Sequence, residues 1–149
     1  MLQMKKVNKL AVAYSGLKDV LGDTVRDWRP PSFKTELEYR NHLFDYLRES
    51  VPDDTRVEKE YRHSGTTLDL FVSYTGALGT STEVFFELKR NLTKKVEFDR
   101  LVGQVEGMLP DKHIVFVVLV GDLDESLVGR LRNKYSERIS IIEVPRVRR

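Results

Sequence analysis

The chain contains no cysteine, and this absence excludes disulfide bridges and thiolate metal ligands. It also has no long apolar run, because its most hydrophobic stretch, residues 113–121, is far too short to cross a bilayer. Glycine-rich phosphate loops, Ser-His-Asp arrangements, internal repeats and low-complexity tracts are missing as well. These absences argue against a membrane protein, a disulfide-stabilised scaffold and the common nucleotide-binding classes.

Excess charge is scarce too. The 25 basic and 23 acidic residues give a net charge of +2, which is too small to indicate a nucleic-acid binder by composition. The N-terminus carries two lysines before an interrupted apolar patch, which does not match a signal peptide. We therefore expect a cytoplasmic protein without membrane contact, and leave a viral or mobile-element origin open. Its 149 residues suffice for one domain with a real core.

Apolar spacing and chain breakers predict the order of the elements. An amphipathic helix is expected from Lys5 to Leu21, ending near Gly22 before two prolines. A second helix follows, with Ser32 or Thr35 as its cap and a proline as its stop. Strands are expected over residues 56–63, 67–74, 82–89, 113–120 and 139–144, and further helices over residues 93–109 and 124–138. This order predicts an α/β fold with a mixed central sheet flanked by helices.

The predicted hairpin of residues 67–89 carries charged side chains where a strand pair would normally be apolar. If it is symmetric about Leu78, opposed residue numbers sum to 156, and Asp69 then faces Glu87. Strand alternation also places Lys89 on their face, together with two phenylalanines. Two opposed carboxylates repel each other unless a cation lies between them, and Mg²⁺ prefers such oxygen ligands.

A third acid lies on the preceding helix. At 100° per residue, Glu36 falls near the middle of the apolar face, whereas Glu38 points away from it. That face comprises Leu37, Tyr39, Leu43, Phe44, Tyr46 and Leu47. An acid on the core side of a first helical turn is either a fraying surface residue or a site residue.

These residues together resemble the PD-(D/E)XK nuclease superfamily, which has the restriction-endonuclease-like fold. The resemblance rests on "TTLDLFV" followed by "VFFELK", on the helix acid and on the element order. It implies an αβββαβ core over residues 33–120 within a single domain of residues 1–149. Residues 1–31 form an N-terminal helical extension, and residues 121–149 add a helix, a strand and a basic tail.

The resemblance also implies roles for individual residues. Asp69 matches the first acid of the motif, Glu87 the (D/E) position and Lys89 the lysine. Glu36 matches a helix acid found in many members, including archaeal Holliday junction resolvases, and Gln104 a glutamine carried by some branches. Two positions depart from the pattern: Leu68 replaces the usual proline, and Met108 stands where a RecB-like tyrosine is expected.

The implied activity is metal-dependent hydrolysis of phosphodiester bonds in DNA by an endonuclease. Asp69, Glu87, the backbone carbonyl of Leu88 and Glu36 would hold Mg²⁺ or Mn²⁺. DNA contacts are expected from Lys94, Lys95, Arg100, His63 and Ser64. A homodimer would supply two sites for cutting two strands. Two alternatives stay open: a catalytically inactive nucleic-acid-binding or assembly module of the same fold, and a structural interaction protein.

Overall fold

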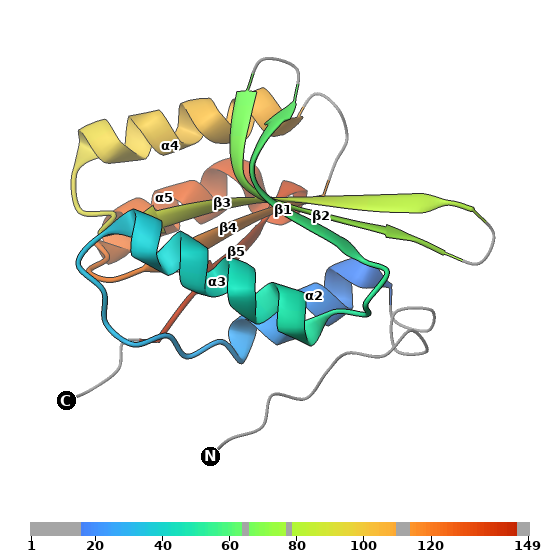
Figure 1. Cartoon of the computed structure of the whole chain (residues 1–149). Coiled ribbons are helices and arrows are strands. Elements are labelled where there is room, and N and C mark those ends of the chain that lie inside the picture. The colour runs from blue at the N-terminus through green and yellow to red at the C-terminus, as the bar shows by residue number, and fades with distance from the viewer. Residues whose placement is uncertain (1–15, 64–65, 77–78, 110–113, 146–149) are drawn as a thin grey trace.

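The computed structural model describes residues 16–63, 66–76, 79–109 and 114–145, and five strands of this part form one mixed sheet (Figure 1). The strands are β1 (Arg56–His63), β2 (Thr66–Thr75), β3 (Ser81–Arg90), β4 (Ile114–Val120) and β5 (Ser140–Glu143). They lie side by side in chain order. The pairs β1–β2 and β2–β3 are antiparallel, whereas β3–β4 and β4–β5 are parallel.

Helices cover both faces of this sheet, two on each side (Figure 1). One face packs against α2 (Leu17–Arg26) and α3 (Glu36–Ser50), and the other against α4 (Lys95–Met108) and α5 (Glu125–Tyr135), which a short 3₁₀ helix, η2 (Ser136–Arg138), follows. The β3 side chains alternate between the two cores as predicted: Phe86 and Leu88 face α3, and Phe85 faces α4. The predicted α/β fold with its αβββαβ order is confirmed.

Local sequence signals account for most element ends. Thr35 caps α3 by accepting a hydrogen bond from the backbone N–H of Glu38 at 3.2 Å. Asp124 caps α5 in the same way, accepting from the N–H of Ser126 at 2.9 Å. The strand β4 is buried on both faces, as its continuous apolar sequence predicts. No helix in the described ranges is long and apolar enough to cross a membrane.

The expected end of the first helix was wrong. Residues 1–15 lie outside the described residues, but α2 continues through Gly22 to Arg26. A glycine lowers helix propensity by about 1 kcal/mol relative to alanine, which is not enough to end a helix that packs on the sheet. Burial of Leu21 and Val25 on either side keeps the helix in place.

The predicted apolar face of α3 was wrong at Leu37, which is 53% exposed. The buried residues Tyr39, Leu43 and Leu47 share one direction, and at 100° per residue Leu37 points about 120° away from it. By the same count Glu36 lies about 20° from that direction. The helix therefore turns an acid, and not the neighbouring leucine, toward the sheet.

Candidate active site

The site lies where β2 separates from β3. Their ladder runs from Thr75–Ser81 to Leu70–Phe86, and each pair sums to 156, the predicted register. The ladder stops one residue before Asp69, so Asp69 is not a strand partner of Glu87. Its side chain replaces the lost pairing, because Oδ2 accepts a hydrogen bond from the Leu88 N–H at 2.8 Å. This hydrogen bond fixes the orientation of the Asp69 carboxylate.

Glu87 is the deeply buried acid of the site. Its side chain is 4% exposed, and its Oε2 has no hydrogen-bond partner. Desolvation, followed by the charge of Asp69 and a hydrogen bond with it, raises the pKa of Glu87 to about 10. The charge of Glu36 acts in the same direction, and Lys89 opposes it. Despite the Lys89 ammonium, the net rise in pKa favours the protonated form of Glu87 when no metal ion is bound.

Glu36 reaches the same site from the first turn of α3. Burial is the main cause that raises its pKa, the Lys89 ammonium opposes the shift, and Asp69 adds to it. The Arg90 backbone donates a hydrogen bond to the Glu36 carboxylate, at the end of β3. The side chain is half-buried. The sequence left open whether Glu36 is a fraying surface residue or a site residue, and these interactions place it beside the other acids.

Lys89 of β3 forms an ion pair with the first turn of α4. Its Nζ lies 3.1 Å from Oε2 of Glu97, in the first turn of α4, and the two side chains are only 16% and 23% exposed. Glu97 was not among the site residues predicted from the sequence. Its one local signal is an acid in a first helical turn, which is common and is usually explained by the helix dipole. The ion pair with Lys89 forms only when α4 packs on β3, so no local sequence pattern predicts it.

The donor set suits a hard divalent cation, although the side chains are not arranged around one. Among the described residues, no group of three His, Asp or Glu side chains is placed to hold a metal ion. Nevertheless, Glu87 Oε2 is buried without a partner, and Asp69 and Glu36 both interact electrostatically with it. Carboxylate oxygens in this number are what Mg²⁺ and Mn²⁺ take as ligands. The residues present therefore fit the predicted metal chemically.

The other predicted site residues lie outside this cluster. Gln104 is exposed on α4, seven residues after Glu97 and so about 10 Å further along the helix axis. Lys94, Lys95 and Arg100 are exposed at the start of α4, and Lys95 pairs with an aspartate one turn on at 2.8 Å. His63 ends β1 and Ser64 follows it. The His63 side chain and all of Ser64 lie outside the described part.

A separate cavity of about 270 Å³ opens beside the carboxyl ends of β3 and β4. Phe33, Arg90, Asn91 and Gly121 are among its lining residues, and none of the acids described above lines it. A cavity at this edge is common in α/β sheets. Because none of the acids of the site lines it, this cavity is separate from the candidate active site.

Comparisons with known proteins give only weak structural similarities. No protein-family model and no curated protein sequence matches the chain. Among solved structures, a repair endonuclease from Pyrococcus abyssi is 18% identical with a TM-score of 0.45, over 80% of this chain and 50% of that one. The MspJI restriction endonuclease, solved in complex with a 27-mer oligonucleotide, is 20% identical with a TM-score of 0.40. That match covers 93% of this chain and 30% of MspJI.

The chain thus spans half or less of the length of these two nucleases. At TM-scores below 0.5, a shared fold does not follow from either similarity. The fold assignment rests instead on the element order and the mixed central sheet, both of which were predicted from the sequence.

Proposed function

We propose that the chain is a metal-dependent endonuclease that hydrolyses phosphodiester bonds in DNA. One observation carries this proposal: Asp69 and Glu87 meet where two strands part, Lys89 and Glu36 lie beside them, and Glu87 Oε2 is buried without a partner. A purely structural role does not explain why an acid with a strongly raised pKa is kept in the core.

Mg²⁺ or Mn²⁺, when bound, would supply Lewis-acid chemistry at the scissile phosphate and lower the pKa of a bound water. Asp69 and Glu87 would hold it with the Leu88 carbonyl, and Glu36 would extend the set. The Leu88 N–H keeps the Asp69 carboxylate oriented. Glu87 must release its proton to act as a ligand. Lys89 would orient the attacking water or neutralise developing charge, and Glu97 holds its ammonium group.

Contacts to DNA would come from exposed cations near the site. Lys94, Lys95 and Arg100 lie at the start of α4, five to eleven positions after Lys89 in the chain. Such side chains bind phosphates and position a duplex without reading its sequence. Gln104 would contact the DNA backbone from the same helix. Cutting both strands requires two active sites, and a homodimer would provide them.

The second candidate is a catalytically inactive DNA-binding module of the same fold. Two features of the site favour this candidate. The Lys89 ammonium is paired with Glu97, and the carboxylates of the described residues are not gathered in a metal-binding arrangement. Such a protein would bind DNA, and it would not cleave DNA with any divalent cation.

A cleavage panel separates the two candidates. Linear, single-stranded and branched DNA are each incubated with Mg²⁺ or Mn²⁺ and with wild-type, Asp69→Ala, Glu87→Ala or Glu49→Ala protein. Glu49 is an exposed acid on α3, so its variant is the matched control. We expect the two site variants to lose cleavage by at least about a thousandfold and the control to keep it. Unchanged cleavage by folded Glu87→Ala discards the nuclease assignment, and binding without cleavage by the wild type favours the inactive module.

A further inference from the structure

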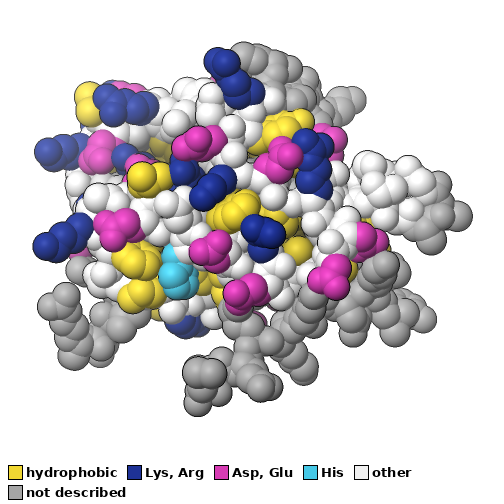
Figure 2. Space-filling model, in the orientation of Figure 1, with side chains coloured by type: hydrophobic (Ala, Val, Ile, Leu, Met, Phe, Trp, Pro, Cys, Tyr) yellow, Lys and Arg dark blue, Asp and Glu magenta, His cyan; other side chains and the backbone are white. Residues whose placement is uncertain are grey.

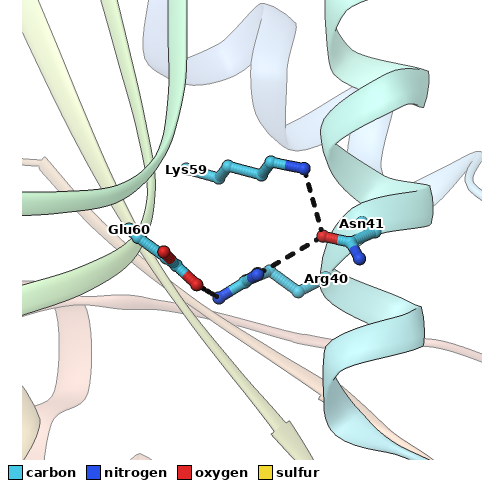
Figure 3. Close-up of polar contacts among 4 residues, drawn as sticks. All are labelled: Arg40, Asn41, Lys59 and Glu60. Carbon is cyan, nitrogen blue, oxygen red and sulfur yellow. Dashed lines mark hydrogen bonds and ion pairs between the residues drawn. The ribbon is translucent and has the colours of Figure 1, made fainter.

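Two cations and an acid meet between α3 and β1, in a group that none of the roles above uses (Figure 3). Arg40 Nη1 lies 2.8 Å from Oε1 of Glu60. Arg40 Nη2 and Lys59 Nζ each lie 3.4 Å from Oδ1 of Asn41. We call these four residues the α3–β1 cluster. Two positive groups here share one neutral amide oxygen at distances longer than the usual 2.9–3.0 Å.

The backbone is distorted at the acid of this cluster. Glu60 has a φ of 56°, a left-handed conformation that non-glycine residues rarely adopt. Strand alternation breaks at this residue. Lys59 contacts α3, whereas Tyr61 stacks on Phe71 at the α4 side, with ring centroids 4.1 Å apart. The distortion therefore turns Glu60 toward Arg40 when regular alternation would turn it away, and strain of this kind is often kept at functional positions.

The α3–β1 cluster adjoins the proposed active site on two sides. Arg40 follows Glu36 by one helical turn, so the two side chains lie on the same face of α3. On the strand side, the β1–β2 partners Lys59–Leu70 and Tyr61–Leu68 place Glu60 beside Asp69. A DNA strand at the acids would pass within reach of the α3–β1 cluster.

The guanidinium of Arg40 is incompletely satisfied. The side chain is 13% exposed, and its Nε is buried without a hydrogen-bond partner, whereas Glu60 is 64% exposed. Two cations against one carboxylate leave the cluster with a net charge of +1. A guanidinium fork matches the geometry of a phosphate, and a phosphate would accept from both cations in place of the Glu60 carboxylate and the Asn41 amide oxygen.

The charges on the surface around the cluster indicate that a phosphate would be bound by individual side chains and not by a broad positive patch. Figure 2 shows Lys and Arg side chains at the centre of the face that carries α3, with Asp and Glu side chains around them. Mixed charges of this kind produce no broad positive field that would attract DNA from a distance. An individual cation next to the acids is therefore the group that can fix a backbone phosphate.

We propose that Arg40 and Lys59 bind a backbone phosphate of the DNA strand that enters the site. Glu60 holds the Arg40 guanidinium in the free protein, and the phosphate displaces the Glu60 carboxylate when DNA binds. This inference rests on the proposed function, since it assumes that the acids act on DNA. Glu60 thereby acts as an internal competitor: removing its charge strengthens DNA binding, and removing Arg40 weakens it.

The test compares DNA affinities at several salt concentrations, with EDTA present so that no cleavage occurs. Fluorescence anisotropy of labelled duplex is measured for wild-type, Glu60→Gln, Arg40→Gln and the double variant. The matched control is Glu58→Gln, which removes the same charge two residues away on β1, where Glu58 pairs with Arg56 at 2.8 Å. We expect Arg40→Gln to lose about tenfold in affinity and to reduce the salt slope by about one. Glu60→Gln should bind several-fold more tightly than Glu58→Gln, and only while Arg40 is present.

Several results overturn the inference. Equal gains from Glu60→Gln and Glu58→Gln would show a general charge effect, and an unchanged Arg40→Gln would remove the phosphate contact. Because Arg40 is largely buried, Lys59→Gln supplies a second variant at an exposed position, with an expected loss of several-fold. Unchanged variants beside a wild type that binds DNA overturn this inference alone, whereas a wild type that binds no DNA overturns the proposed function with it.

Discussion

At the scale of single residues, the ammonium group of Lys89 has two kinds of neighbour. The acids of the site influence it from one side, and Glu97 holds it at 3.1 Å from the other. A long flexible side chain loses rotamer freedom in such a pair, so the geometry of Lys89 depends on Glu97 being charged. Glu97 is thus a positioning residue in the proposed reaction.

Replacing Glu97 by Gln should therefore slow the reaction without weakening the binding of DNA. We expect the cleavage rate at saturating DNA to fall about tenfold, with the KM within twofold of the wild type. Steady-state kinetics on the best substrate of the panel measures both. Asp99→Asn, which breaks an exposed pair with Lys95 on the same helix, is the control and should change neither. Equal kinetics for Glu97→Gln and wild type would leave Glu97 without a role.

Individual residues also show how much of the site the sequence can predict. Glu87 and Lys89 follow from the period of two in β3, and the direction of Glu36 follows from the 100° step of a helix. The predicted pairing of Asp69 with Glu87 was wrong, because the ladder of β2 with β3 stops before Asp69, whose side chain instead accepts a hydrogen bond from the Leu88 N–H. Glu97 and Arg40 do not follow from any local pattern. Glu97 acquires its partner only when α4 packs on the sheet, and Arg40 meets Glu60 only because a glutamate adopts a backbone conformation typical of glycine.

At the scale of the elements, hydrogen bonds join the segments that follow β3 and β4, at the carboxyl ends of these two strands. Asn91, with a φ of 58°, accepts a hydrogen bond on Oδ1 from the Asp122 N–H at 2.8 Å. Its own N–H donates to the Val120 carbonyl at 2.9 Å. Gly121 lies between these contacts with a φ of 78°. The junction fixes where β3 ends, and so where Lys89 and the Glu36 contact lie.

A side chain at Gly121 should break this junction. A Cβ there would lie 2.2 Å from Asn91 Oδ1, in a conformation that L-residues rarely adopt. We expect Gly121→Ala to lower the free energy of unfolding by about 2–3 kcal/mol, measured by urea denaturation. Gly129→Ala in α5 is the control, because nothing lies within 4 Å of its added Cβ. That variant should be more stable by roughly 0.5–1 kcal/mol, and similar losses in both would refute the argument.

Element ends follow from the sequence less well than element types. The strand β4 and the register of β2 with β3 are predicted by apolar run and by symmetry. The end of α2 was predicted wrongly at Gly22, since a glycine only weakens a helix, and the burial of Leu21 and Val25 carries α2 past it. Leu37 was wrongly expected to be buried, because a broad apolar helix face does not specify which part of it packs against the sheet.

At the scale of the whole molecule, the buried acid links folding to pH and to metal. Burial and the charge of Asp69 raise the pKa of Glu87 in the folded chain well above the ordinary value of 4.5, near which an unfolded glutamate releases its proton. Between these values the folded state holds the extra proton. The free energy of unfolding contributed by Glu87 therefore falls as pH rises, by at most about 1.4 kcal/mol per pH unit. A divalent cation bound by the folded chain would offset this loss.

The substitution Glu87→Gln should remove both the pH dependence and the metal dependence that Glu87 gives to the stability of the fold. In EDTA, we expect its stability relative to wild type to increase from pH 5 to pH 8, because the amide needs no proton when buried. With Mn²⁺ at pH 8, the midpoint of thermal unfolding should rise by several degrees for wild type and stay unchanged for the variant. At pH 5 the wild-type gain should shrink, since protons compete with the metal. Circular dichroism melts at both pH values, with Glu49→Gln as the exposed control, measure these shifts. A variant that responds to Mn²⁺ as the wild type does would place the cation away from the carboxyl groups where β2 leaves β3.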